Sequence, residues 1–547
     1  MRIGLGQFDA VVGDLEGNAG RMREIYRQAR QKDVELLLFP ELAVCGYPPE
    51  DLLLKRHFLD ENRQTVERIA ADCPDATIML GFADYYRGQT YNCAGILRDG
   101  RLTDVYRKSL LPNYGVFDER RYFEPGKKPL VISLNGINFA VTICMDIWDI
   151  VWLARFLKNA GRIDMVLNIS ASPFHLGKIE LRKEIVRQCV EQFKSPACYC
   201  NLVGGQDELV FDGRSMFADA AGNIVAIARG FEEDLLIADV TMRDGAAQIE
   251  PQGVSAIAHL DILDETYHAL VLGTRDYVKK NGFAKAMVGL SGGIDSAVTA
   301  GLAVAALGAQ NVIGITMPSK FNSPDTISDA EKCAKNLGIE FMTIPIWPVL
   351  ERFNDSLKQA PRWDSSGIAY ENLQARIRGT ILMSLSNQWN AIVLTTGNKS
   401  ETAVGYATLY GDTAGGFAVI KDVFKTMVYK LAHYINDINR REIIPKSVID
   451  RVPTAELRPN QKDTDSLPEY DLLDKILKGY VEEDQSARQL IDEGLPKEVV
   501  NRVIGMVDRN EYKRRQSPPG VKITPKAFGR DRRLPITNRY NHWGNSK

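Results

Sequence analysis

The chain has 547 residues, a length typical of two or more domains, and its 45% hydrophobic and 25% charged residues are an ordinary balance for a globular protein. Lys and Arg number 68 against 70 Asp and Glu, and the formal net charge of -2 excludes a general electrostatic attraction to nucleic acid or to an anionic membrane. Small molecules are therefore the expected partners.

The N-terminus, MRIGLGQFDAVVGD, has no basic segment leading into an apolar run, and no window approaches the roughly 18 uninterrupted apolar residues of a membrane helix. The eight cysteines are scattered without a CxxC pair, which favours buried thiols over disulfides. The six histidines are dispersed and show no metal-binding spacing. We therefore predict a cytoplasmic protein.

From residue 1 to about 240, short apolar runs alternate with amphipathic stretches, which predicts α/β layering. The expected elements are the strands IGLGQFDA, ELLLFPEL and TIMLGFADYY and the helices NAGRMREIYRQARQK and HFLDENRQTVERIAADC. Two pairs of runs, YNCAGILRDGRLTDVYRK and SMFADAAGNIVAIA, turn like hairpins, so we expect a mixed sheet. DLLIADV at 234–240 is the expected last strand of this half.

Residues 241–262 lose the periodicity and gather Gly, Gln and Pro, a composition typical of a connecting segment. We therefore predict a first domain over 1–245, a linker over 246–262 and a second domain over 263–547.

Strands and helices alternate regularly after residue 263, which predicts a parallel, doubly wound sheet. The expected elements are KAMVGL, SAVTAGLAVAALG, NVIGITMP, TISDAEKCAKNLG, IEFMTIPI, ENLQARIRGTILMSLSNQW and AIVLTTG. The helix SAVTAGLAVAALG is apolar on nearly every face and is expected to be buried.

The stretch GLSGGIDS at 289–296 lies between an expected strand and an expected helix. Gly292 and Gly293 allow the backbone to approach an anion closely, and the start of a helix favours negative charge. The spacing matches neither GxxxxGK[ST] nor GxGxxG. A carboxylate beside phosphate needs a cation between them, so Asp295 predicts a Mg²⁺ that bridges to pyrophosphate. Taken alone, the stretch also fits a tight turn with Asp295 as a helix cap.

This loop resembles the pyrophosphate loop of the N-type ATP pyrophosphatases, which adenylylate a substrate and release pyrophosphate. Further segments of the second half resemble the NAD synthetases: ENLQARIRG (371–379), TTGNKSE (395–401), GDTAGG (411–416), DVFKT (422–426) and YKRRQSPPG (512–520).

The resemblance implies a role for particular residues of the second half. ATP would be bound by Gly289, Leu290, Ser291, Gly292, Gly293, Ile294, Asp295, Ser296, Thr396 and Lys425. Deamido-NAD would be bound by Asn372, Arg376, Glu401 and Lys513, and Mg²⁺ by Asp295 and Glu401. Taken singly, such charged residues are more often solvated surface groups, so their co-occurrence carries the prediction. One departure is the absence of a lysine shortly before GDTAGG, where small ammonia-using synthetases have one.

Three segments of the first half resemble the Glu, Lys and Cys motifs of the nitrilase superfamily: LFPELAVCGYPPEDLL around Glu41, VYRKSLLPNYGVFDERRYF around Lys108 and FAVTICMDIW around Cys144. The resemblance implies an α-β-β-α sandwich that releases ammonia from L-glutamine. A lone cysteine in an apolar strand is usually core, but three motifs in the family's order favour catalysis. Cys198 and Cys200, at i and i+2 of one strand, are expected to be core.

In that family's chemistry, Cys144 is the nucleophile, Glu41 the general base and acid, and Lys108 the cation that stabilises thiolate and oxyanion together with the Met145 N–H. The implied supporting residues are Glu119, which would orient Lys108, and Tyr114, Ser172 and Lys178, which would bind glutamine. Glutamine-dependent NAD synthetases commonly have an acidic residue directly after the nucleophile, and this chain has Met145. A missing carboxylate there could weaken recognition of the glutamine α-amino group.

Together the two resemblances imply a ligase that adenylylates deamido-NAD with ATP and amidates it with ammonia from L-glutamine, the last step of NAD biosynthesis. The ammonia is expected to travel through an internal channel. By resemblance we also expect a homo-oligomer that pairs through the nitrilase-like domains.

Three alternatives stay open. Another amidotransferase of the ATP family would need an N-terminal cysteine or a Cys-His-Glu glutaminase, and neither motif is found. An enzyme that activates a tRNA base would need an extended basic stripe. A first half that has lost glutaminase activity through Met145 could serve as an assembly scaffold.

Overall fold

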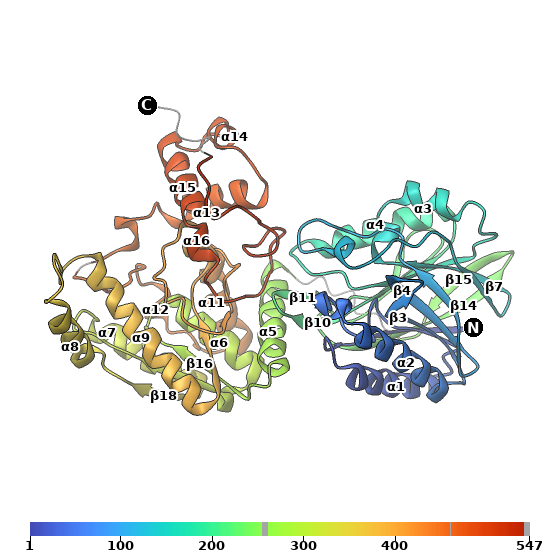
Figure 1. Cartoon of the computed structure of the whole chain (residues 1–547), viewed down its shortest axis with the longest axis horizontal. Helices are drawn as coiled ribbons and strands as arrows, with labels where there is room; N and C mark the ends of the chain where they lie inside the picture. The colour runs from blue at the N-terminus through green and yellow to red at the C-terminus, as the bar shows by residue number, and fades with distance from the viewer. Residues whose placement is uncertain (254–260, 460, 541–547) are drawn as a thin grey trace. The chain divides into compact units, whose positions relative to one another are not determined.

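The protein is described by a computed structural model that covers residues 1–253, 261–459 and 461–540. It divides into two compact units, Met1–Leu260 and Asp261–Lys547, which Figure 1 colours in chain order. No helix in the described part of the chain is long and apolar enough to cross a membrane.

Two sheets form the centre of the first unit. The larger runs in the order β15 (Ala246–Pro251), β14 (Asp234–Arg243), β1 (Arg2–Gln7), β2 (Leu36–Leu38), β3 (Thr77–Tyr86), β4 (Gln89–Arg98) and β5 (Arg101–Arg107). The smaller runs β13 (Ile224–Ile227), β12 (Met216–Ala218), β9 (Ala197–Asn201), β8 (Met165–Ser170), β7 (Ile137–Ile143) and β6 (Val131–Leu134). Parallel and antiparallel pairs occur in both, and both predicted hairpins, β4 with β5 and β12 with β13, are confirmed. A separate hairpin joins β10 (Val203–Gln206) to β11 (Leu209–Asp212).

Side chains alternate across the strands as the pleat requires. In β2, Leu36 and Leu38 pack between the two sheets, whereas Leu37 faces the helices. Helices α1 (Leu15–Arg30) and α2 (Arg56–Asp72) cover the larger sheet, and α3 (Ile150–Leu157) and α4 (Lys178–Phe193) cover the smaller one. Figure 1 shows the two helix pairs on opposite sides of the unit. The predicted α-β-β-α sandwich is confirmed.

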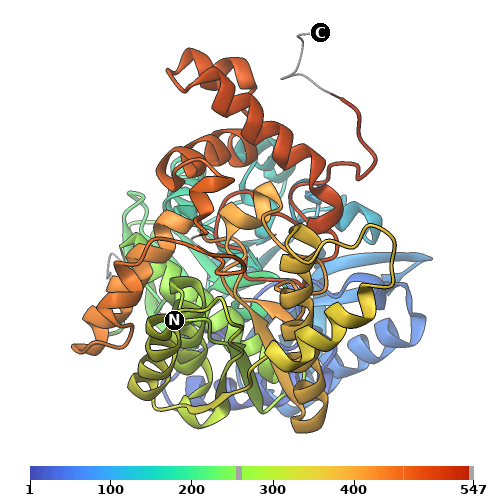
Figure 2. The same cartoon turned by 90° about the vertical axis from the view of Figure 1, so that its left-hand side faces the viewer.

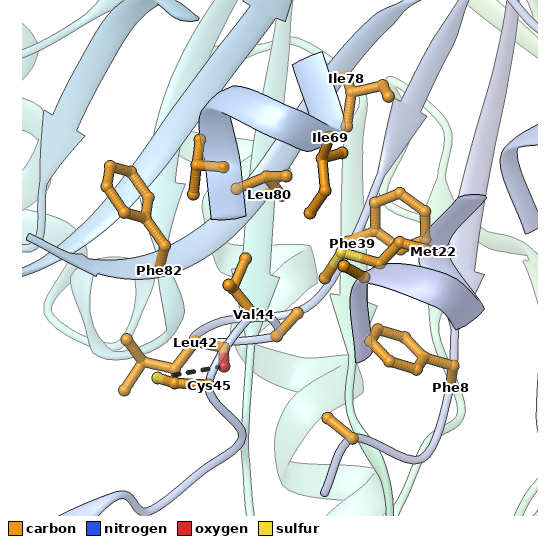
Figure 3. Packing of buried hydrophobic residues seen from close by; sticks show 14 of the residues in the cluster. Phe8, Met22, Phe39, Leu42, Val44, Cys45, Ile69, Ile78, Leu80 and Phe82 are labelled. Carbon is orange, nitrogen blue, oxygen red and sulfur yellow. Dashed lines mark hydrogen bonds between the residues drawn. The ribbon is translucent and has the colours of Figure 1, made fainter. Parts of the chain in front are cut away.

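The apolar layer under α1 and α2 also holds the segment that follows β2. Figure 3 shows Met22 and Ile69 of the helices packed against Phe39 and the β3 residues nearby. Leu42 and Val44, on the same segment as Phe39, are fully buried in this layer. Glu41 lies between Phe39 and Leu42 in sequence, so the packing fixes the backbone that carries its carboxylate.

The prediction of a linker over 246–262 is wrong for residues 246–251. Residues 246–251 form β15, which pairs antiparallel with β14, so DLLIADV is not the last strand of this unit. Ala247 and Ile249 of β15 are buried and alternate with exposed neighbours. Residues 254–260 of that prediction lie outside the described residues, and α5 (Ile262–Lys280) begins at its end.

The second unit contains a five-stranded sheet in the order β18 (Glu340–Thr343), β17 (Val312–Thr316), β16 (Lys285–Gly289), β19 (Ala391–Thr395) and β20 (Phe417–Ala418). Every neighbouring pair is parallel, as predicted. The apolar helix α6 (Ile294–Leu307) is buried against β16, β17 and two further helices, α5 and α11 (Lys425–Asn439). On the sheet, Met287 and Val393 share a core cluster with α8 (Trp347–Leu357) and α9 (Ile368–Trp389).

The C-terminal helices form a core of their own with the end of α10 (Lys399–Val404). They are α13 (Tyr470–Leu477), α14 (Ala487–Asp492) and α15 (Lys497–Arg509), and the short helix α16 (Glu511–Arg514) follows them. Figure 2 shows these orange to red helices grouped at one end of their unit. The remaining helices of the unit are α7 (Pro324–Leu337) and α12 (Lys446–Ile449).

The strand order creates a switch point between β16 and β19. These strands are neighbours, although β17 and β18 lie between them in sequence and on the far side of β16. In open parallel sheets, ligands bind beyond the carboxyl ends of the strands at such a point. The loop after β16 and the segment after β19 therefore meet at the place where a ligand is expected.

Leu38→Ala tests the packing between the two sheets. Leu38 is fully buried, and we expect this change to lower the free energy of unfolding of the first unit by about 2 to 5 kcal/mol because it leaves a cavity. Urea denaturation would measure the loss. Leu54→Ala is the matched control, since Leu54 is 65% exposed and its truncation should change stability by less than about 0.5 kcal/mol. Equal effects of the two changes would contradict the layered core.

Candidate active sites

The first candidate site lies where several strands of the sandwich end. Glu41 follows β2, Lys108 follows β5 and Cys144 follows β7. Gly81 in β3 makes room for the Glu41 turn, since a Cβ atom at this glycine would lie 2.2 Å from the Leu42 backbone nitrogen. The fold thus brings together three residues that the sequence keeps far apart.

Lys108 is fully buried between two carboxylates. Its Nζ lies 2.6 Å from Glu41 Oε1 and 2.8 Å from Glu119 Oε1. Burial opposes the positive charge, but Glu119 and Glu41 outweigh it and raise the pKa of Lys108. Burial raises the pKa of Glu119, against the opposing effect of the lysine. Lys108 therefore stays protonated, and the cluster carries more acid than base.

Cys144 sits on a sharp turn at the end of β7. Its φ of 42° lies in the left-handed region, where the chain leaves the strand and enters a short 3-10 helix, Cys144–Ile147. Non-glycine residues in this conformation are uncommon and often mark functional sites. Burial first, and then the charge of Glu41, raises the pKa of the Cys144 thiol. This environment therefore favours the neutral form of the Cys144 thiol.

Sequence analysis did not identify the groups that hold Glu41 and Glu119 in place. Asn92 Nδ2 donates to Glu41 Oε1 at 2.7 Å, and the Ala171 N–H donates to Glu41 Oε2 at 2.9 Å. Tyr47 donates its hydroxyl to Glu119 Oε1 at 2.9 Å. Asn92 lies in β4, with no motif around it to signal a role.

Asp146 is a further well-connected residue that was not predicted from the sequence. Its Oδ2 accepts from Tyr106 OH at 2.8 Å and from Ile143 N at 3.0 Å. Its Oδ1 accepts from Ser109 N at 3.2 Å and from Leu110 N at 2.9 Å. This buried carboxylate joins the turn of the nucleophile to the backbone directly after Lys108. The sequence around Asp146 does not indicate these partners, because Tyr106, Ser109 and Leu110 lie far from it in the chain.

The three residues expected to bind glutamine have different environments. Tyr114 is 55% exposed and its hydroxyl lies 3.6 Å from Met145 Sδ. Ser172 is buried, and its Oγ accepts from Arg182 Nε at 3.1 Å. The Lys178 ammonium group lies 4.2 Å from the centroid of the Trp148 ring.

The second candidate site is the loop between β16 and α6. Ser291 and Ser296 organise it, because the Ser291 N–H donates to Ser296 Oγ at 3.2 Å and Ser296 Oγ donates to Gly293 O at 2.9 Å. Gly292 has a φ of 82°, and a Cβ atom there would lie 2.1 Å from the Thr326 carbonyl oxygen. The N-terminus of α6 has no side-chain cap, so it favours an anion.

Asp295 is not a helix cap, since the N-cap of α6 is Gly293. Its carboxylate forms an ion pair with Lys425 and accepts from Asn398 Nδ2 at 2.9 Å. Lys425 Nζ also lies 3.6 Å from Glu401 Oε1. Burial first, and then the charge of Asp295, raises the pKa of Glu401. A surplus of negative charge therefore faces the loop.

A cavity of about 310 Å³ opens over this loop. All ten residues expected to bind ATP line it, and so does Glu401. Arg378, which the sequence analysis missed, lines it as well and donates through Nε to Met317 O at 2.9 Å. Burial lowers the pKa of Arg378 to about 10. Arg378 follows Arg376, the arginine that the sequence predicted, by two residues. It lies on the face of α9 that lines the cavity.

The other residues expected to bind deamido-NAD lie beside the cavity. In the part of the chain that the structure describes, Asn372, Arg376 and Lys513 do not line it. Asn372 Oδ1 accepts from Thr408 Oγ1 at 2.8 Å, Arg376 Nε donates to Leu409 O at 3.2 Å, and Lys513 Nζ donates to Gly405 O at 2.8 Å. All three hold the loop 405–409, of which Thr408 reaches the cavity.

Comparison with known families divides the chain in the same way as its structure. Residues 2–249 match the carbon-nitrogen hydrolase family, and residues 266–517 match the NAD synthase family.

Relatives with both parts match along the whole chain. A glutamine-dependent NAD(+) synthetase from Thermotoga maritima is 44% identical over 99% of this chain and 99% of its own length. One from Acinetobacter baylyi is 44% identical over 98% of each. The solved structure of the glutamine-dependent NAD+ synthetase from Acinetobacter baumannii, in complex with ADP, is 41% identical, covers 100% of this chain and 99% of its own, and superposes with a TM-score of 0.77. The chain belongs to the glutamine-dependent NAD(+) synthetase family.

Membership of the glutamine-dependent NAD(+) synthetases confirms both resemblances, and the two departures noted in the sequence can now be placed. Met145 is half-buried and faces Tyr114. Tyr410 directly precedes GDTAGG, and the carbonyl oxygen of Leu409, one residue earlier, accepts from Arg376. Lys513, from α16, instead acts electrostatically on Asp412 of this motif.

Asp146→Asn tests the link between the nucleophile turn and Lys108. The amide keeps one acceptor oxygen but turns its N–H groups towards backbone donors. We therefore expect the free energy of unfolding to fall by about 1 to 3 kcal/mol. We also expect alkylation of Cys144 by iodoacetamide to become slower. Denaturation and mass spectrometry would measure these effects.

The matched control for this test is Asp149→Asn. Asp149 caps α3 by accepting from Trp152 N at 2.9 Å, and Asn is an equivalent cap. Unchanged alkylation in Asp146→Asn would show that the carboxylate does not position Cys144.

Proposed function

We propose that the first unit hydrolyses L-glutamine at Cys144 and that the second unit uses ATP and the released ammonia to convert deamido-NAD into NAD. One observation supports this proposal above all. The same chain contains a buried Glu41–Lys108 cluster at the Cys144 turn and a cavity over the loop 289–296. Both belong to units that match the corresponding families.

In the glutaminase reaction, Glu41 takes the proton of the Cys144 thiol as Sγ attacks the side-chain amide carbon of glutamine. Lys108 and the Met145 N–H stabilise the tetrahedral oxyanion. Collapse breaks the C–N bond, Glu41 returns the proton to the leaving nitrogen, and ammonia departs. A water activated by Glu41 then hydrolyses the thioester to glutamate. The raised pKa of Cys144, caused by burial, supports the need for this base.

Glutamine recognition is assigned to Tyr114, Ser172 and Lys178. Arg182 is fully buried, and its pairing with Asp212 Oδ1 at 2.6 Å fixes the guanidinium group. The same group donates to Ser172 Oγ and so holds this hydroxyl in place. Because Met145 provides no carboxylate, this binding relies on the hydroxyl groups of Tyr114 and Ser172. The intact ion pairs of Lys108 favour an active glutaminase over an assembly scaffold.

In the synthetase reaction, a nicotinate carboxylate oxygen of deamido-NAD attacks the α-phosphorus of ATP, and pyrophosphate leaves. Ammonia then attacks the acyl carbon, loses a proton and displaces AMP, which yields NAD. The N–H groups of the loop 291–295 and the start of α6 receive the pyrophosphate. Lys425, freed from part of its pairing with Asp295, neutralises phosphate charge.

The chemistry of the cavity suits Mg²⁺. Asp295 and Glu401 are oxygen ligands of the kind that Mg²⁺ prefers, and they would hold it together with phosphate oxygens. Asp412 and Asp463 add negative charge that acts on Glu401. A bound cation would relieve this repulsion and supply charge neutralisation for the leaving group.

Deamido-NAD is assigned to the loop 405–412 and the residues that hold it, Asn372, Arg376 and Lys513. Lys513 is partly buried, and burial lowers its pKa. Its position near Asp412 makes it the cation that replaces the lysine missing before GDTAGG.

The cellular setting of this proposal is the cytoplasm, because all eight cysteines are free and buried, as in reducing compartments. We also propose a homo-oligomer that pairs through the first unit. Val151 of α3 and Leu181 of α4 are 59% and 49% exposed on the outer face of the sandwich, which favours a contact there.

Cys144→Ala separates the two reactions. We expect it to abolish NAD synthesis with glutamine while synthesis with added ammonium continues, because only the nitrogen source is lost. Chromatography of NAD formed from deamido-NAD and ATP would measure both rates. The control is Cys198→Ala, which alters a buried cysteine of the core between the sheets. Equal loss of activity with glutamine and with ammonium would contradict the assignment of the two reactions to separate units.

Asp295→Asn tests the pyrophosphate site. Removal of the charge that faces Mg²⁺ and Lys425 should lower ammonium-supported synthesis by about 100-fold or more, as measured by pyrophosphate release. The matched control is Asp325→Asn, an exposed carboxylate in the first turn of α7, which should retain the parent rate. Full activity of Asp295→Asn would remove this residue from the site.

A further inference from the structure

The segment Asn398–Glu401 divides its side chains between the cavity and the protein interior. Asn398 donates to Asp295, and Glu401 lines the cavity. The two residues between them, Lys399 and Ser400, are fully buried. The start of α10 is therefore held from behind by groups that do not belong to the cavity.

Lys399 is held by three side chains from distant parts of the unit. Its Nζ lies 2.7 Å from Asp422 Oδ1 and 2.7 Å from Glu482 Oε1, and it donates to Thr524 Oγ1 at 2.6 Å. An ammonium group at 0% exposure must have every proton accepted, because a buried charge without partners is strongly unfavourable. A fourth and longer contact runs from Lys399 Nζ to the Lys526 carbonyl oxygen at 3.1 Å, so the three side chains provide the short contacts that set the geometry of Lys399.

Thr524 belongs to a segment, 518–532, that follows the residues matched by the NAD synthase family, 266–517. Asp422 anchors it by accepting from Ile523 N at 2.8 Å and from Thr524 N at 2.7 Å. The segment also meets the sheet, since the Ala418 N–H donates to Pro519 O at 2.8 Å. The segment 518–532, which lies outside the part that matches the NAD synthase family, thus packs behind Asn398–Glu401.

Ser400 ties the same turn to the helix that carries Lys425. The Lys425 N–H donates to Ser400 Oγ at 2.9 Å, and Ser400 forms a hydrogen bond with Asp474. Asp474 Oδ2 in turn accepts from Thr426 N at 3.0 Å. A shift of the start of α10 would therefore move Asn398, Glu401 and Lys425 together.

We propose that Thr524 is a positioning residue of the synthetase site, acting through Lys399 to hold Asn398 and Glu401 in their places beside Asp295. This inference rests on the proposed function of that site. Without the Thr524 hydroxyl, Lys399 exchanges its 2.6 Å contact for the longer one of 3.1 Å to the Lys526 carbonyl oxygen, and Asp422 loses a donor. The lysine then shifts towards Glu482 and takes the first turn of α10 with it. The C-terminal segment is in this way a part of the ATP site, although it does not line the cavity.

Thr524→Val tests the proposal, because it keeps the shape of the side chain and removes the hydroxyl. We expect the KM for Mg·ATP and the Mg²⁺ concentration for half-maximal rate to rise about 10-fold in the full-length enzyme supplied with ammonium. The KM for deamido-NAD should change less than about twofold, since the residues that the proposed function assigns to it lie on α9, on α16 and in the loop 405–412, and not at the start of α10. Thr524→Ser, which restores a hydroxyl, should recover most of the Mg·ATP affinity.

Lys526→Ala is the matched control on the same segment. The Lys526 side chain pairs with Asp484, which is 74% exposed, so its removal should leave both KM values at the parent level. Parent KM values in a folded Thr524→Val enzyme would overturn the proposal, and so would an equal rise in Thr524→Ser. If Thr524→Val fails to fold, Glu482→Gln provides the second variant, with the same expected rise in KM for Mg·ATP.

The parent enzyme separates this inference from the proposed function. If the parent does not form NAD from deamido-NAD, ATP and ammonium, the proposed function fails. If the parent forms NAD and Thr524→Val matches it, only the positioning role fails.

Discussion

A lysine that is buried in a protein must have acidic partners, and this requirement shapes both units. Lys108 lies between Glu41 and Glu119, Lys425 between Asp295 and Glu401, and Lys399 between Asp422 and Glu482. In each case the three charged groups come from separate segments, so the ion pairs can form only when the surrounding strands and helices are in place. Loss of one partner would leave an uncompensated charge in the interior, which is far less favourable than loss of a surface pair.

The three clusters differ in how completely their negative charge is compensated. Burial raises the pKa of Glu119 and of Glu401 against the effect of their lysines. Each of these clusters lies at one of the two candidate sites. At Asp422, burial is outweighed by Lys399, by Lys522 and by hydrogen bonds, and its pKa is lowered. At Glu482, the other partner of Lys399, burial raises the pKa against the effect of the lysine, so the Lys399 cluster contains one carboxylate of each kind.

Both sites lie beyond strand ends, for a topological reason. In the second unit, β16 and β19 are adjacent and parallel, so the loop that begins at Ser291 meets the segment that begins at Thr396. In the sandwich, Glu41, Lys108 and Cys144 follow strands of two different sheets. Rigid strands fix the position of each end, and the short segments after them carry the reactive groups.

The sequence by itself determined the two fold classes and the residues that lie in local motifs, because hydrophobic periodicity and motif spacing are short-range properties. Glu41, Cys144 and the loop 289–296 could be recognised in this way. The tertiary structure alone decided which side chains support them. Asn92, Asp146, Arg378 and Thr524 carry no local signal, since each acquires its role from partners in distant segments. β15 was mistaken for linker for the same reason, because an edge strand is defined by the strand with which it pairs.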